Sequence, residues 1–123
     1  PGENGLTHFI EHMLFKGTSN RDALEIAKEI DRIGGFINAF TGREFTCFYV
    51  KVLKDHIEKG FEILSDIFHH SLFKIEDIEN ERMVILQEIK MGEDSPEEYV
   101  HDLFARKLWG KAPLGFPISG TAE

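Results

Sequence analysis

The spacing of apolar residues along the chain predicts five helices and one β-hairpin. Apolar positions that recur three and four residues apart fall on one face of a helix, whereas runs of aromatic and β-branched residues favour strands. The predicted helices run from Leu6 to Lys16, from Ser19 to Ile33, from Ile57 to His70, from Ile75 to Met91 and from Ser95 to near Gly110. The stretch from Pro113 to Gly120 is rich in Pro and Gly and is expected to be a loop.

Short motifs mark where three of these helices begin or end. Gly17 follows the first helix and suits the left-handed backbone after a helix end. Ser19 and Asp22 have the spacing of a capping box, although Asp is shorter than the preferred Glu. Ser95, followed by Pro96 and two glutamates, is typical of a first helical turn.

The predicted hairpin has strands at Phe36 to Thr41 and Phe45 to Leu53, with a turn at Gly42-Arg43. Apolar residues occupy both alternating sets of positions in the second strand, which indicates a central strand covered on both faces. A two-stranded sheet is marginal in water. Two alternatives follow: further strands lie outside this chain, or the chain contains strands that the pattern does not reveal.

Composition indicates one ordinary domain of 123 residues, because 41% of them are hydrophobic and 11 are Phe. We expect the Phe side chains and Trp109 to lie in its core. No apolar run approaches the roughly 20 residues of a membrane helix, so membrane insertion is not expected. The net charge of −8 has the wrong sign for a nucleic-acid partner or an anionic membrane surface.

The single cysteine, Cys47, allows no disulfide within the chain and suits a reducing compartment. We expect the cytoplasm for a bacterial protein and the mitochondrial matrix for a eukaryotic one. The chain begins at Pro1 rather than Met, so we expect its natural start, with any targeting segment, to be absent from this sequence.

The densest group of metal-binding side chains is His8, Glu11 and His12, within the first predicted helix. Spacing of four residues places both imidazoles on one face, where they can bind one zinc ion. Glu11 lies beside that face and can take a proton from a metal-bound water. A chance match is the alternative, since the chain has six histidines.

A catalytic zinc site needs a third protein ligand, and the fourth predicted helix supplies two candidates. Glu81 and Glu88, seven residues apart, share the apolar face of that helix with Ile78 and Ile85. Buried carboxylates are costly unless something positive meets them. A zinc ion is one such partner, and Arg82 is the structural alternative because it can pair with Glu81 or with a neighbouring helix.

The stretch from Gly5 to Thr18, GLTHFIEHMLFKGT, resembles the signature of the pitrilysin family, which includes insulin-degrading enzyme and mitochondrial processing peptidase. The resemblance is nearest to bacterial members similar to the processing peptidases. It implies a zinc site in which Glu11 acts as general base beside His8 and His12. Glu88 lies 76 residues after His12, where the family carries its third ligand. By the same resemblance, Glu81 supports the site without binding zinc.

Two further segments extend the resemblance over most of the chain. Residues 34–41, GGFINAFT, are similar to a family segment that binds substrate along a sheet edge, which implies that Asn38, Ala39 and Phe40 contact substrate. Residues 113–121 match a later family segment. The resemblance implies an α+β fold with helices on one face of a mixed, largely antiparallel sheet. Residues 1–123 would then be part of an N-terminal zinc-binding peptidase domain that lacks its first strands and its C-terminal part.

These features together predict a zinc endopeptidase that hydrolyses peptides or presequence-like segments with a metal-activated water. The family resemblance implies a second homologous half or subunit, in a homodimer or heterodimer, so this chain alone is expected to be inactive. One alternative is a non-catalytic subunit of a larger assembly, which the complete motif disfavours. S-ribosylhomocysteinase lyases share an inverted His-x-x-Glu-His motif, but the long spacer to Glu88 argues against them.

Overall fold

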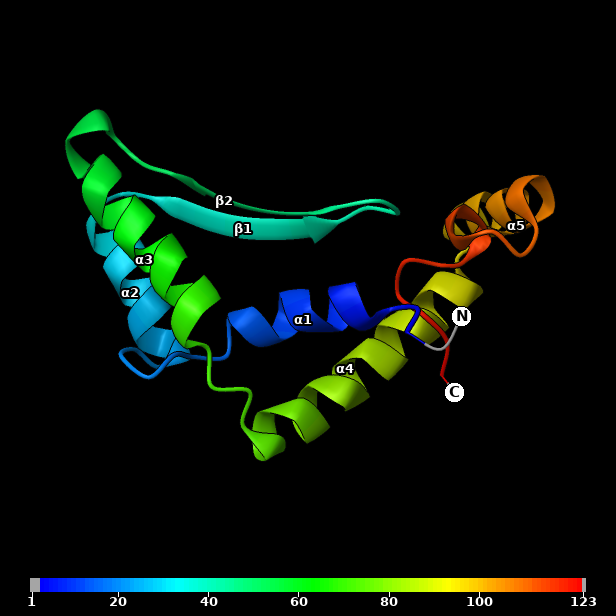
Figure 1. The fold of residues 1–123 in the computed structure, drawn as a ribbon, viewed down its shortest axis with the longest axis horizontal. Coiled ribbons are helices and arrows are strands. Elements are labelled where there is room, and N and C mark those ends of the chain that lie inside the picture. Colours follow the sequence, from blue (N-terminus) through cyan, green and yellow to red (C-terminus); the bar gives the residue numbers. More distant parts are fainter. Residues whose placement is uncertain (1–2, 123) are drawn as a thin grey trace.

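A computed structural model describes residues 3–122, which form five α-helices and a β-hairpin (Figure 1). In chain order the elements are α1 (Leu6–Leu14), α2 (Ala23–Arg32), β1 (Phe36–Thr41), β2 (Thr46–Lys51), α3 (Ile57–His70), α4 (Ile75–Asp94) and α5 (Pro96–Trp109). Short 3₁₀ turns occupy Lys54–His56 and Pro113–Gly115. The five predicted helices and the predicted hairpin are therefore confirmed. None of the helices in the described range combines the length and apolar character needed to cross a membrane.

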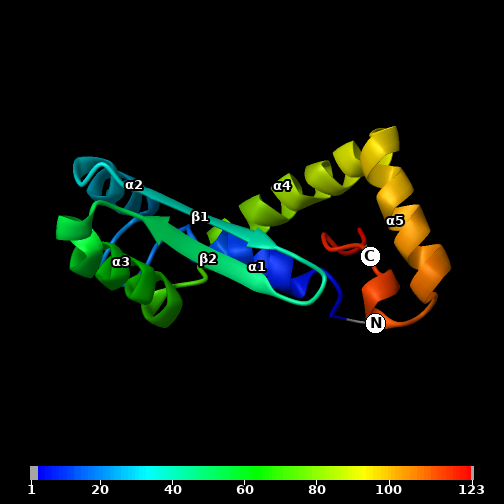
Figure 2. The ribbon, with the colours of Figure 1, turned by 90° about the horizontal axis from the view of Figure 1, so that it is seen from above.

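The sheet consists of β1 and β2, which pair antiparallel with Phe36 opposite Lys51 and Thr41 opposite Thr46. Helices α1, α2 and α3 lie against one face of this hairpin (Figures 1 and 2). That face carries Phe48 and Val50, which pack on the core. The core cluster consists of Leu14, Ile26, Ile30, Ile63 and Ile67. The arrangement confirms the predicted α+β class with helices on one face of an antiparallel sheet.

The opposite face of the hairpin is aromatic and exposed. Phe36, Phe40 and Phe45 keep about half or more of their surface accessible, and Phe40 meets Phe45 edge to face with ring centroids 5.8 Å apart. The expectation of a strand covered on both faces is therefore wrong for residues 3–122, because these residues supply helices to one face only. The expectation that Trp109 and the Phe side chains form the core is wrong for Trp109 and for most of the Phe side chains, which are exposed, whereas Phe15 and Phe48 are partly buried and pack against the core.

The start of α2 differs in detail from the predicted capping box. Asp22 is the N-cap and exchanges hydrogen bonds with Glu25, so the box begins at Asp22 rather than at Ser19. Ser19 instead donates its backbone N–H to the carbonyl of His70, at 2.9 Å. This bond ties the loop after α1 to the last residue of α3, so α2 begins only after Asp22.

Asp66 of α3 is the main anchor for that loop. It is buried and accepts hydrogen bonds from Thr18 at 2.7 Å, from Asn20 at 2.5 Å and from Arg21 at 2.8 Å. Arg21 also binds Glu29 of α2 at 3.0 Å. The end of α1, α2 and α3 are thereby fixed to one another.

This anchor predicts an acid-sensitive contribution to stability. Burial alone would raise the pKa of Asp66, but hydrogen bonds from Thr18, Asn20 and Arg21 lower it to about 2. A lowered pKa stabilises the fold above the unfolded value of 3.8, and the stabilisation is lost as the pH falls toward 2. We expect Asp66→Asn to cost about 2 kcal/mol in the free energy of unfolding at pH 7. Urea unfolding of both proteins at decreasing pH should show this difference shrinking below about pH 4, and a constant difference would contradict the assignment.

Candidate metal centre

Helix α1 presents two histidines side by side. His8 and His12 are one turn apart, their Nε2 atoms are 3.2 Å apart, and their rings meet edge to face with centroids 4.6 Å apart. Both imidazoles are mostly buried, because α1 lies between the hairpin and α4. The two ring nitrogens therefore converge on one point at the surface of the helix.

Glu88 reaches the same point from α4. Its Oε2 atom lies 3.8 Å from His8 Nε2 and 3.6 Å from His12 Nε2. In a tetrahedral zinc site with bonds of about 2.0–2.1 Å, ligand atoms are about 3.4 Å apart. The three separations of 3.2, 3.6 and 3.8 Å lie on both sides of this value. The donor set therefore fits a zinc ion, and among residues 3–122 it is the one such cluster that could hold a metal.

The electrostatic surroundings favour the neutral form of His8, which is the form that binds metal. Burial lowers the pKa of His8 and the neighbouring His12 lowers it further, whereas Glu88 and Glu11 raise it and only partly offset these effects. Because the result lies below the usual 6.5, His8 is mostly neutral at pH 7. Its Nε2 lone pair is then available to a cation.

Glu81 orients His12 from the side opposite the metal-facing nitrogen. Its Oε1 atom accepts a hydrogen bond from His12 Nδ1 at 2.7 Å, which leaves the lone pair of His12 on Nε2. The Glu81 carboxylate is 4% exposed and also pairs with the ammonium group of Lys16. Burial would raise the pKa of Glu81, but the hydrogen bonds from Lys16 and His12 outweigh it and lower this pKa.

Arg82 does not serve as the partner of Glu81. Its guanidinium is exposed and pairs with Glu79 on the same helix, at 3.3 Å. The structural alternative offered for Arg82 is therefore wrong, and Glu81 instead accepts hydrogen bonds from His12 of α1 and from Lys16 just after that helix.

Glu11 lies outside the three-atom cluster. Its Oε2 atom accepts a hydrogen bond from the hydroxyl of Thr41, the last residue of β1. Thr41 in turn lies 3.1 Å from the hydroxyl of Thr46, its register partner on β2. The carboxylate of Glu11 is thus held at the end of the hairpin, on the same helix as the two imidazoles.

The three β1 residues expected to contact substrate have different surroundings. Asn38 borders a cavity of about 320 Å³, and its Oδ1 accepts the backbone N–H of Ala39 at 2.8 Å. Ala39 is buried toward the helices, and Phe40 lies on the exposed aromatic face. The other residues that line the cavity are Glu11, His12, Phe15, Lys16, Ala23 and Glu81. Of the three predicted contacts, only Asn38 borders this cavity.

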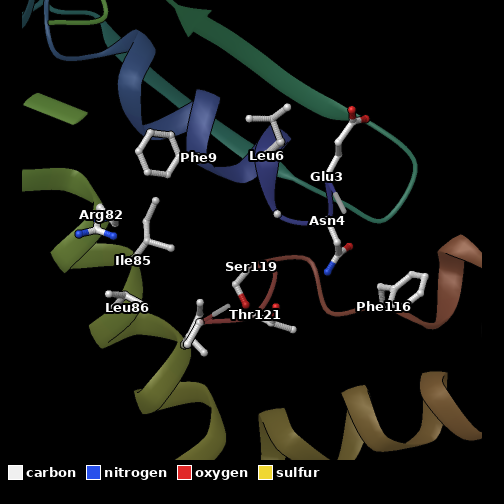
Figure 3. A pocket seen from close by; sticks show the side chains of 13 residues that line it. Glu3, Asn4, Leu6, Phe9, Arg82, Ile85, Leu86, Phe116, Ser119 and Thr121 are labelled. Carbon is white, nitrogen blue, oxygen red and sulfur yellow. The ribbon is translucent and has the colours of Figure 1, made fainter. Parts of the chain in front are cut away.

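A larger cavity of about 650 Å³ lies on the other side of α1, between its first turn, α4 and residues 116–122. Figure 3 shows Phe9 of α1 opposite Ile85 of α4 at this cavity. The three ligand residues and Glu11 do not line this cavity. The larger cavity is therefore not the one that adjoins the candidate metal ligands.

The sequence did not lead us to predict two residues of the site, Lys16 and Thr41. Lys16 follows His12 by four residues, which is a usable signal, because that spacing returns a side chain to the same helix face. Thr41 gives no comparable signal, since its contact with Glu11 joins residues 30 positions apart. Only the folded arrangement of α1 on the hairpin brings that pair together.

Comparisons with known proteins give matches over nearly the whole chain. The family model described as Insulinase (Peptidase family M16) matches residues 1–122. A Bacillus subtilis protein named "uncharacterized zinc protease YmxG" is 50% identical over all 123 residues, and a Streptomyces coelicolor protein with the same "uncharacterized zinc protease" description is 46% identical over the same length. The chain spans about 30% of the first relative and 27% of the second.

Solved structures show the same fold. A protease from Helicobacter pylori matches 98% of this chain with a TM-score of 0.90 and 27% identity, and the match covers 29% of that chain. A peptidase M16 inactive domain from Pseudomonas fluorescens matches 95% of this chain with a TM-score of 0.84 and covers 29% of that chain. The second match is 15% identical and supports the fold alone.

Proposed function

Because the chain belongs to the insulinase family of peptidases, family M16, we propose that it forms the zinc-binding part of a metalloendopeptidase. One observation carries the proposal. The Nε2 atoms of His8 and His12 and the Oε2 atom of Glu88 converge from two helices at the spacing of zinc ligands. Glu11 stands beside them on α1, with its carboxylate held by Thr41.

Each residue has one task in this proposal. His8, His12 and Glu88 hold the metal, and Glu81 keeps His12 in the tautomer that presents Nε2. Zinc, when bound, acts as a Lewis acid and makes water acidic enough to give up a proton near neutral pH. Glu11 takes that proton on the oxygen that Thr41 leaves free, and later donates it to the departing amine.

The unpaired edge of β1 is the proposed site for an extended peptide substrate. Within residues 3–122, β1 pairs with β2 along one edge only. Backbone pairing along the other edge gives affinity with little dependence on side-chain identity. Asn38, Ala39 and Phe40 would contribute backbone groups there, and a bound peptide would displace the Asn38 side chain from the Ala39 N–H that now donates to it at 2.8 Å.

We propose that the complete protein is longer than this chain. The chain spans about 30% of its first relative, and we propose, as the family resemblance implies, that it is part of the N-terminal zinc-binding domain of a longer peptidase. A second homologous half or subunit would close over the peptide, so residues 1–123 alone should bind zinc without cleaving peptides or presequence-like segments. The bacterial relatives and the lone Cys47 support a reducing bacterial cytoplasm as the location.

Metal analysis and a cleavage assay on the full-length protein test this function together. We expect one zinc ion at this site, cleavage of members of a mixed-sequence peptide library, loss of cleavage after chelation and recovery when zinc is restored. Zinc binding without any cleavage would instead identify a non-catalytic subunit. Absence of zinc binding would overturn the proposed site itself.

A further inference from the structure

The carboxylate of Glu11 is held from outside its own helix. Its Oε2 atom accepts a hydrogen bond from the Thr41 hydroxyl, at the point where β1 ends against α1. Glu11 and Thr41 are both partly buried, so water competes less for this bond than at an exposed position. A hydrogen bond to an ionised carboxylate is among the stronger kinds in proteins.

The number of protons that each group carries determines which group donates in the hydrogen bonds that support this contact. An ionised carboxylate can only accept, so Thr41 must give its single hydroxyl proton to Glu11. The Thr46 hydroxyl, 3.1 Å from Thr41 Oγ1, must then be the donor between the two threonines. The resulting chain runs from Thr46 through Thr41 to Glu11 and fixes the rotamer of the middle residue.

The turn that follows Thr41 is itself tightly held. Gly42 donates its N–H to the carbonyl of Phe45 at 2.7 Å, which closes the turn. Arg43, within this turn, donates to the carbonyl of Leu114 at 3.1 Å and to Asp102 of α5 at 2.7 Å. It also donates to the carbonyl of Phe116. The end of the hairpin is therefore fixed to residues 114–116.

The same C-terminal segment also contacts the start of α1. Asn4 donates its side-chain amide to the carbonyl of Pro117 at 2.9 Å, and Figure 3 shows Asn4 beside the segment with Phe116 and Ser119. A Cβ on Gly120 would lie 2.8 Å from the Asn4 carbonyl oxygen, so the two backbones approach closely. One segment thus holds both the helix that carries Glu11 and the hairpin that carries Thr41.

We propose that Thr41 is a positioning residue for the general base, because its hydroxyl holds Glu11 Oε2 and leaves the other carboxylate oxygen free to receive a proton. The proposal rests on the zinc-peptidase function proposed above. It adds a residue that neither binds the metal nor touches the reacting atoms. Thr46 and Arg43 contribute indirectly, by fixing the Thr41 rotamer and the hairpin end.

A pair of substitutions separates the hydroxyl from the shape of Thr41. Thr41→Val keeps the branched shape and removes the hydroxyl, whereas Thr41→Ser keeps the hydroxyl and removes a methyl group. In the full-length, zinc-loaded protein we expect Thr41→Val to lower kcat by about 10- to 100-fold, the range expected when a catalytic group is misplaced. KM and zinc affinity should stay within about twofold of wild type, because the Thr41 hydroxyl is not a proposed metal ligand and the peptide is proposed to pair with the backbone of β1 rather than with this side chain. Thr41→Ser should keep most of the wild-type kcat.

A structural readout makes the test independent of turnover. Crystal structures of the zinc-loaded variants should show Glu11 in its wild-type rotamer in Thr41→Ser and displaced or disordered in Thr41→Val. An unchanged Glu11 rotamer in Thr41→Val, or an equal loss of kcat in both variants, would overturn the proposal. If the wild-type protein binds zinc but cleaves none of the library peptides, the proposed function fails while the Glu11 rotamer still decides the role of Thr41.

Discussion

Replacing Glu11 with Gln in the full-length protein should abolish most peptide turnover while zinc binding stays close to wild type. The amide keeps the size of the side chain and can still accept the Thr41 hydrogen bond, but it cannot take a proton from water. Loss of a general base typically costs about 10²–10⁴ in rate. Since Glu11 lies outside the cluster of His8, His12 and Glu88, the metal site should persist.

Zinc content and single-peptide kinetics on the same Glu11→Gln preparation measure both effects. Loss of zinc along with turnover would mean that Glu11 is a ligand, and that the proposed roles of the two glutamates are reversed. Turnover close to wild type would show that another group takes the proton.

The same inactive variant offers a way to locate the substrate. A peptide crystallised with it should lie as an added strand along the free edge of β1, near Asn38 and the cavity that Glu11 borders. A peptide bound against α3 instead would contradict the assignment of this edge.

Helical periodicity predicted much of the site because α1 and α4 are regular helices. The spacing of His8 and His12 on α1 and of Glu81 and Glu88 on α4 determined which side chains share a face, and the structure brings all four together. Periodicity could not predict how deeply each of these side chains is buried. Glu81 is buried, whereas the side chain of Glu88 is 42% exposed, because burial depends on where α1 lies along α4.

The sides of the sheet could not be assigned from its strand pattern. Both alternating sets of β2 are apolar, so the sequence alone does not say that Phe48 faces the helices while Tyr49 faces outward. The sequence did not predict the contacts of the C-terminal segment either, since the hydrogen bonds from Arg43 to Leu114 and Phe116 join residues more than 70 positions apart. Contacts of this kind are set by how the elements assemble, and no local spacing encodes them.

A graded series on α4 distinguishes a metal ligand from a residue that orients one. Glu88→Gln removes the charge of the proposed third ligand while keeping its volume. Glu81→Gln leaves the ligands in place and weakens the hold on His12, an effect typically worth about 10- to 100-fold in metal affinity. Glu76→Gln, at an exposed position in the first turn of α4, is the matched control.

We expect Glu88→Gln to weaken zinc binding by more than about 100-fold, beyond the effect of the orienting residue, because two imidazoles alone cannot complete the three-ligand set of a catalytic zinc site. The carboxylate also offsets the charge of the cation, which the neutral amide cannot do. Competition with a chromogenic chelator gives the affinity of each variant, and Glu76→Gln should match wild type. Equal affinities for Glu88→Gln and Glu76→Gln would show that the convergence of Glu88 on the two imidazoles does not reflect metal binding.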